Sequence, residues 1–258
     1  MPVTPSRLDA LRAEIRAIER VGATVEARPG VAFGLAEVDA RLAGGGLGVA
    51  LHEAAAASPT PNDDAAATLF LAAAAARFAF ASGGGGGAQM LWALTRRDLF
   101  APALAQVGLS PDRLLYAECR NDAEVLAVME EGVRHGGLAA VIGEVGRAEM
   151  AATRRLQLAA EEGGTAALLL RRWRKRDCDP LVPPSAAATR WRLACAPASP
   201  LPFDALGRAR WRVELVRQRG GPSHHWLLEA PDAEARLALP ARPRDREDQA
   251  GGTHRIAA

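Results

Sequence analysis

Apolar residues recur along the chain with two different periods, and the alternation between these periods predicts the fold. Short continuous apolar runs predict strands at residues 48–55, 88–95, 113–118, 138–145 and 165–170. Segments of helical periodicity predict helices at residues 34–42, 63–80, 98–107, 122–135 and 147–162. Apolar strands that alternate with helices are typical of a parallel sheet with both faces covered.

After residue 184 the pattern changes to an alternation of apolar and charged positions. Four such segments are joined by short turns rich in Gly and Pro, at residues 189–196, 208–219, 225–230 and 234–239. A period of two predicts an antiparallel meander with one face in water. The expected fold class is therefore α/β, with a mainly parallel sheet between helices that is extended by C-terminal antiparallel strands.

Two terminal segments lie outside this pattern. Residues 6–21 have helical periodicity, and their apolar stripe consists of Leu8, Leu11, Ile15 and Ile18. Such a helix either packs on the domain or offers its stripe to a partner. Residues 240–258 are polar and contain Pro and Gly, which predicts a disordered tail or a short partner-binding peptide. We expect a helical appendage over residues 1–30, one domain over residues 31–239, and this tail.

Composition narrows the class of protein without indicating a ligand. Of 258 residues, 49% are hydrophobic and 24% are charged, as in globular domains, and the net charge of +2 is too small to indicate nucleic-acid binding. The N-terminus lacks the apolar core of a signal peptide, and the apolar run at residues 65–76 is shorter than the roughly 20 residues of a membrane span. The three cysteines form no C-x-x-C pair, which fits a reducing compartment. We expect a cytoplasmic protein without a membrane segment.

The order of the elements resembles the core of RecA-type ATPases. The segment FGLAEVDARLAGGGLGVALHEAA resembles the one in which a short helix and a Gly-Gly-Leu turn lead into the first core strand. The resemblance implies that a nucleotide-binding loop follows. Such a loop needs glycines whose N–H groups surround the phosphates, a Lys for the β- and γ-phosphates, and a Ser or Thr for magnesium.

The loop in this sequence is degenerate. The segment that begins at Ala54 and ends at Phe70 contains neither Gly nor Lys, and Asp63 and Asp64 place two carboxylates where they cap the helix and repel a phosphate. Glu144 occupies the position where the resemblance implies an Asp that holds magnesium. An Arg-Arg-Asp run follows the strand at 88–95, where a catalytic Glu is implied, and Arg cannot act as a base. We expect no cofactor and no enzymatic activity.

Several further segments, taken in order, resemble the ImuA family of RecA-like proteins from bacterial damage-inducible mutagenesis operons. They are LWALTRRDLFAPALAQVGLSPDRLLYAE, AAVIGEV, RRLQLAAEEGGTAALLLRRW, PSAAATRWRL and RWRVELVRQRGG, and the resemblance covers about residues 31–239. It implies work in translesion synthesis beside an ImuB-like adaptor, which is an inactive relative of Y-family polymerases, and an error-prone replicative-type polymerase. RecA is a further candidate partner, and the resemblance places the protein at the nucleoid during DNA damage.

A basic run directly follows the last predicted parallel strand. It consists of Arg171, Arg172, Trp173, Arg174, Lys175 and Arg176. Cations together with an aromatic ring suit single-stranded DNA, and the likeness to RecA implies a DNA-contacting loop at this place. A solvated loop or a docking patch for an acidic partner fits the same residues.

Other side chains that could bind a ligand or a metal have simpler structural interpretations. Trp191, Trp211 and Trp226 alternate with Arg, which predicts Trp in the core and Arg in water, although an Arg/Trp surface could bind DNA or protein. His224 and His225 are adjacent in a strand and should point to opposite faces, which does not suit a metal site. We find no catalytic or metal-binding constellation.

The sequence therefore predicts a non-enzymatic RecA-like accessory protein of SOS-induced translesion synthesis that acts by binding an ImuB-like adaptor, with RecA as a further candidate partner. Two alternatives remain open. One is an ATP-binding regulator of the RecA/KaiC kind with a divergent site, and the other is a cell-division inhibitor of the SulA type, whose chains are shorter.

Overall fold

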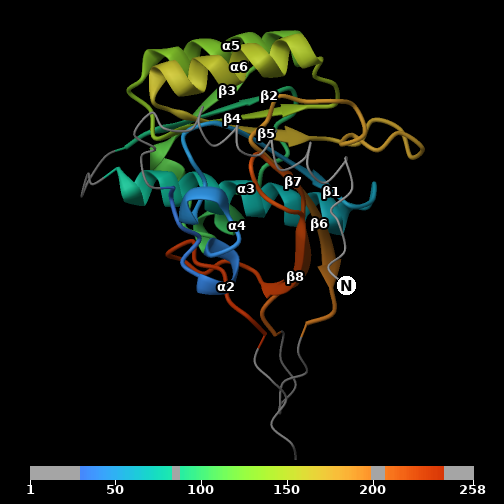
Figure 1. Cartoon of the computed structure of the whole chain (residues 1–258). Coiled ribbons are helices and arrows are strands. Elements are labelled where there is room, and N and C mark those ends of the chain that lie inside the picture. Colours follow the sequence, from blue (N-terminus) through green and yellow to red (C-terminus); the bar gives the residue numbers. More distant parts are fainter. Residues whose placement is uncertain (1–29, 83–87, 199–206, 241–258) are drawn as a thin grey trace, which may run out of the picture.

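An eight-stranded sheet forms the centre of the computed structural model, which describes residues 30–82, 88–198 and 207–240 (Figure 1). The strand order is β3-β2-β4-β5-β1-β6-β7-β8. The strands are β1 Leu51–Ala56, β2 Met90–Leu94, β3 Leu114–Glu118, β4 Ala140–Val145, β5 Ala166–Arg171, β6 Thr189–Ala196, β7 Arg210–Gln218 and β8 His224–Glu229.

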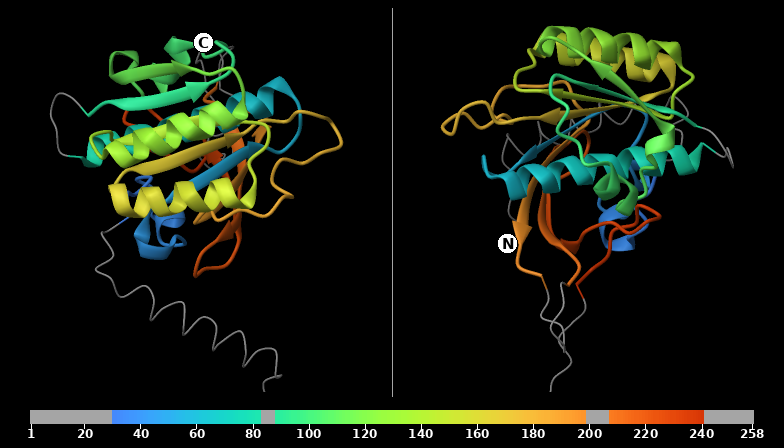
Figure 2. Two further views of the ribbon diagram at one scale, coloured as in Figure 1. Left: turned by 90° about the horizontal axis from the view of Figure 1, so that it is seen from above. Right: turned by 180° about the vertical axis from the view of Figure 1, so that it is seen from behind.

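Helices cover both faces of the parallel part of this sheet. They are α2 Ala36–Asp39, α3 Pro61–Ala81, α4 Ala101–Gln106, α5 Asp122–His135 and α6 Met150–Gly163. Helices α5 and α6 lie side by side on one face, and α3 crosses the other face, where α2 and α4 also lie (Figures 1 and 2). The predicted α/β class, with a mainly parallel sheet between helices and antiparallel strands at its C-terminal end, is confirmed.

The direction of β6 differs from the prediction. This strand pairs in parallel with β1, with His52 opposite Thr189, and only its other edge pairs antiparallel with β7. Residues 189–196 are thus the last parallel strand and not part of a meander. Helix α3 packs on the face of β6 that carries Trp191 and Leu193. The expectation that the intervening Arg residues lie in water is wrong for Arg190, which is 6% exposed and pairs with Glu53. Residues 234–239 were also expected to form a strand, but they make a single bridge between Glu229 and Ala238.

Aromatic packing on the α3 side joins the antiparallel extension to the core. Trp191 is 1% exposed, and its ring centroid lies 5.2 Å from that of Phe70 and 5.8 Å from that of Phe33. Trp211 is also buried, and the half-buried Trp226 stacks on Trp191 at 6.2 Å. The expectation that the tryptophans of β6 and β7 face the core is confirmed.

Helix α3 is apolar around most of its circumference because the sheet and the surrounding segments enclose it. It is the one described helix that is long and apolar enough to cross a membrane, although 67% of its most apolar window is buried inside the protein. This burial is typical of the core helix of a globular domain.

A buried histidine ties β1 to β6 beneath this core. His52 Nδ1 lies 2.8 Å from Thr189 Oγ1, and its Nε2 lies 2.9 Å from the Gly48 carbonyl oxygen. The Thr189 hydroxyl also accepts a hydrogen bond from Trp191 Nε1 at 2.7 Å. These three hydrogen bonds fit a neutral imidazole that donates from Nε2 and accepts at Nδ1. Burial lowers the pKa of His52 from 6.5 to about 4.

Acidification should therefore destabilise the protein through His52. Because its pKa in the folded state is about 4 and its ordinary value is 6.5, the stabilising contribution is complete above pH 6.5 and is lost as the pH falls to 4. The expected loss in unfolding free energy is up to about 3 kcal/mol. Urea unfolding at pH 7 and pH 4 should show a smaller loss for His52→Gln, which does not titrate. Equal losses in the two proteins would contradict this assignment.

Candidate functional site

The connection between β1 and α3 stands where the resemblance placed a phosphate-binding loop. It has four residues, 57–60, and Thr60 Oγ1 caps the helix by accepting a hydrogen bond from Asp63 N at 3.4 Å. The Asp63 carboxylate accepts from the Ser58 hydroxyl at 2.6 Å and from Cys195 N at 2.8 Å. The predicted cap at Asp63 and Asp64 is therefore wrong, because α3 begins at Pro61 and both aspartates lie in its first turn.

Arg172 occupies the space beside this helix terminus. Its Nη1 contacts the Asp64 carboxylate, and its Nε and Nη2 lie 3.0 Å and 2.8 Å from Glu144 Oε2. Its Nη2 is also 3.9 Å from Asp98 Oδ1. The other Glu144 oxygen accepts a hydrogen bond from Trp92 Nε1 at 2.7 Å. One guanidinium thus links α3, β4 and the segment after β2.

The electrostatics of this group do not suit a phosphate. Burial raises the pKa of Glu144, while the Arg172 guanidinium and the Trp92 N–H act in the opposite direction. A single cation is shared among three carboxylates, so an incoming anion would meet net negative charge. The neighbouring cleft, of about 240 Å³, adds the apolar side chains of Leu99, Phe100 and Leu104 and no further cation.

The basic run does not form one continuous patch. Arg171 and Arg172 turn inward, with side chains 1% and 14% exposed, and each pairs with a glutamate. Trp173 is partly buried, and its Nε1 donates to the Ala56 carbonyl oxygen at 2.8 Å. The run was expected to present five cations, but only three of them extend to the surface.

The surface cations of the run begin with Arg174, whose Nη2 lies 2.5 Å from Asp122 Oδ1. Lys175 and Arg176 follow and are exposed. The inward direction of Arg171 and Arg172 could have been expected from a signal elsewhere in the sequence. A glutamate within a buried apolar strand, as at Glu53 and Glu144, needs a cation as its partner.

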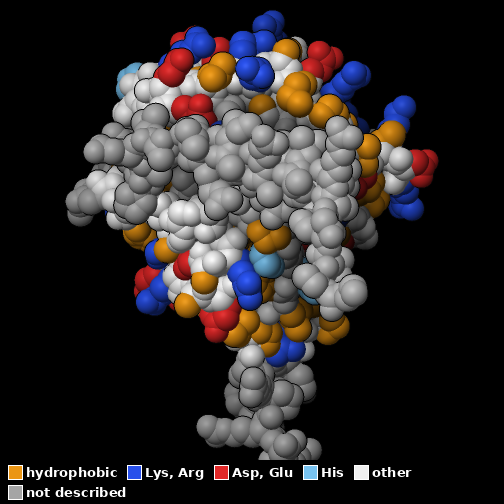
Figure 3. All heavy atoms as spheres, in the orientation of Figure 1, with side chains coloured by type: hydrophobic (Ala, Val, Ile, Leu, Met, Phe, Trp, Pro, Cys, Tyr) orange, Lys and Arg blue, Asp and Glu red, His pale blue; other side chains and the backbone are white. Residues whose placement is uncertain are grey.

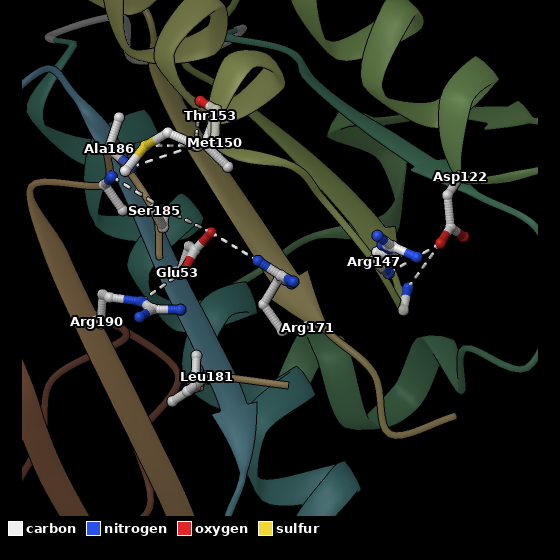
Figure 4. A network of polar contacts seen from close by, with 12 residues as sticks. Glu53, Asp122, Arg147, Met150, Thr153, Arg171, Leu181, Ser185, Ala186 and Arg190 are labelled. Carbon is white, nitrogen blue, oxygen red and sulfur yellow. Dashed lines mark hydrogen bonds and ion pairs between the residues drawn. The ribbon is translucent and has the colours of Figure 1, made fainter. Parts of the chain in front are cut away.

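Glu53 is the centre of a second buried network (Figure 4). Its Oε1 accepts from Arg171 Nη1 at 3.0 Å and from the Ser185 hydroxyl at 2.8 Å, and its Oε2 accepts from Arg190 Nε at 2.8 Å. The Glu53 side chain is 0% exposed. This network fastens β1, β5, β6 and the loop before β6 to one another.

Other predicted features lie apart from this region or outside the described residues. The apolar stripe of Leu8, Leu11, Ile15 and Ile18 and the tail after residue 240 are outside them. Among the residues that are described, no group of three or more His, Cys, Asp or Glu side chains is placed to hold a metal ion.

Comparison with known proteins finds sequence similarity over part of the chain. No family model matches it. Protein ImuA from Caulobacter vibrioides, in strains NA1000/CB15N and ATCC 19089/CIP 103742/CB 15, is 42% identical over 149 residues. Over those 149 residues this chain is similar to protein ImuA. The match covers 56% of this chain and 61% of each relative. The resemblance to the ImuA family that the sequence suggested is confirmed.

A solved structure, SulA from Pseudomonas aeruginosa, is 20% identical and covers 47% of this chain and 97% of its own. Its TM-score is 0.38, which carries no argument about function.

Removal of Arg172 should destabilise the protein strongly. Arg172→Met leaves the buried Glu144 carboxylate without its cation, which should reduce the unfolding free energy by about 3 kcal/mol. The matched control is Arg174→Met, because Arg174 is 62% exposed and its ion pair with Asp122 is at the surface. The control should lose less than about 1 kcal/mol. Equal losses, measured by urea unfolding, would show that Arg172 is an ordinary surface cation.

Proposed function

We propose that this protein is a non-enzymatic accessory protein of SOS-induced translesion DNA synthesis, built on a RecA-like scaffold. Homology to protein ImuA supports a role in damage-inducible mutagenesis. The order of strands and helices, with a short connection in place of a phosphate-binding loop, supports the RecA-like scaffold. The protein acts in the cytoplasm, at the nucleoid during DNA damage.

The Arg172 network is the observation that carries the non-enzymatic part of this proposal. A nucleotide bound in the RecA manner would place its phosphates at the N-terminus of α3. Here Asp63 and Asp64 lie in that first turn, and Thr60 already caps it. A phosphate would also have to compete with Glu144 and Asp64 for Arg172. The chain therefore supplies its own cation and its own anions at this place.

At the end of the molecule formed by α5 and α6, protein partners fit the surface better than nucleic acid does. On the face that Figure 3 shows, acidic and basic side chains are interspersed over the end formed by α5 and α6. Such a mixed surface lacks the broad positive field on which non-specific DNA binding depends. The partners that we propose are an ImuB-like adaptor, through it an error-prone replicative-type polymerase, and RecA.

Nucleotide binding separates this proposal from an ATP-binding regulator. Isothermal titration of the full chain with MgATP, and with ADP in the absence of magnesium, should give no binding up to millimolar nucleotide. The physical reason is the net negative charge around Arg172. Micromolar binding of MgATP would overturn the proposal of a non-enzymatic protein and favour an ATP-binding regulator with a divergent nucleotide site.

The partners can be identified by purification of the tagged chain from host cells after DNA damage, with a high-salt wash. We expect a polymerase-like adaptor and an error-prone polymerase among the bound proteins. Undamaged cells that express the same tagged chain are the control. Recovery of a tubulin-like division protein in place of the polymerases would support the SulA-type alternative and contradict the role in translesion synthesis.

Contact with single-stranded DNA is a subordinate part of the proposal and would use Lys175 and Arg176. The double variant Lys175→Glu/Arg176→Glu should weaken binding to an oligonucleotide and reduce the salt slope by about 0.7 for each lost phosphate contact. Arg96→Glu/Arg97→Glu makes the same change of charge at another exposed site and should alter neither quantity. Identical binding by the two variants would exclude this loop as a DNA contact.

A further inference from the structure

The buried network around Glu53 contains more positive than negative charge. Arg171 and Arg190 both pair with this single carboxylate, and their side chains are 1% and 8% exposed. Arg217 lies at the same place, since its Nη2 donates to the carbonyl oxygens of Ser185 at 3.1 Å and Ala187 at 2.5 Å. Two guanidinium groups therefore share one carboxylate, and a third lies near them.

Neighbouring charges do not remove this excess. Burial lowers the pKa of Arg217, and the nearby Arg190 and Arg219 cations act in the same direction, whereas Glu53 opposes them. Arg219 has its own partner, Glu161, at 3.2 Å. Within the described residues, the ion pairs of Arg171 and Arg190 are with Glu53 alone.

Two N–H groups of this cluster also lack acceptors. Arg171 Nε and Arg190 Nη2 are buried from solvent, and neither makes a hydrogen bond within the described part of the chain. Figure 4 shows both guanidinium groups directed at the Glu53 carboxylate. A buried N–H group of a charged side chain is costly unless it meets an acceptor, and a negatively charged acceptor satisfies the hydrogen bond and the charge together.

We propose that a small monovalent inorganic anion, with chloride as the physiological candidate, binds beside Glu53 and accepts hydrogen bonds from Arg171 Nε and Arg190 Nη2. The burial of the surroundings favours a small ligand, because Ser185, which bonds to Glu53, is 5% exposed and Ala187 is 0% exposed. A water molecule could accept one of these hydrogen bonds but would leave the positive excess in place. This inference stands independently of the proposed function.

The anion would act as a structural ligand of the loop before β6. Ser185 bonds to Glu53, and Ala186 N donates to Thr153 Oγ1 in α6 at 3.2 Å. The loop is therefore held at the cluster, and the same loop carries the exposed Lys175 and Arg176. Occupation of the anion site should stabilise the folded state, because a ligand that binds only this state raises the unfolding temperature.

Anion-dependent thermal unfolding tests the site. The full chain is unfolded in sodium chloride, sodium bromide and sodium gluconate at equal ionic strength. Chloride and bromide should raise Tm by at least about 2 °C over gluconate, with saturation as their concentration rises. Arg190→Met should abolish the difference, because it removes one of the two donors and leaves Glu53 paired with Arg171. Equal Tm values of the original protein in all three salts would overturn the proposal.

A matched control and a second measurement keep the test decisive. Arg192→Met removes a cation from the same strand that pairs with Asp179 and Glu214, and it should retain the full response to chloride. If Arg190→Met does not fold, crystals of the unaltered protein grown in bromide decide the question. An anomalous peak within hydrogen-bond distance of Arg171 Nε and Arg190 Nη2 is expected. A water molecule without anomalous signal at that point would overturn the proposal.

Discussion

Two consecutive arginines at the end of β5 neutralise two glutamates inside the sheet, and the arrangement of the site depends on these pairs. Strand β5 lies between β4 and β1, so Arg171 reaches Glu53 in β1 while Arg172 reaches Glu144 in β4. A buried carboxylate without a cation would be strongly destabilising. The pairs therefore fix the carboxyl ends of three adjacent strands relative to one another.

The same pairs explain why the place of a phosphate-binding loop is closed. Arg172 contacts Asp64 in the first turn of α3, and Glu144 holds it from the other side. The short connection at residues 57–60 bonds to its own helix through Thr60 and to the Leu193 carbonyl oxygen in β6 through Ala57 N. A helix terminus whose charges are satisfied from within suits a protein that acts through its partners, which is the role that we propose for this relative of ImuA.

Local signals predicted the elements well and failed where the decisive partner is distant in sequence. Helix α5 could be predicted because Asn121 accepts from Glu124 N at its start and Gly136, with a φ of 70°, ends it. The direction of β6 could not be predicted, because a parallel strand that is covered mainly on one face has the same alternation of apolar and charged residues as an antiparallel strand. The basic run was misleading for a related reason. Arg171 meets a carboxylate 118 residues away, which no local pattern reveals.

A double-mutant cycle of Arg172→Met and Glu144→Gln, followed by urea unfolding, tests the central claim most directly. Because the two side chains are bonded and largely buried, we predict a coupling free energy of about 2 kcal/mol. A coupling below about 0.5 kcal/mol, the value typical of independent sites, would show that Arg172 does not neutralise Glu144 and would contradict this account.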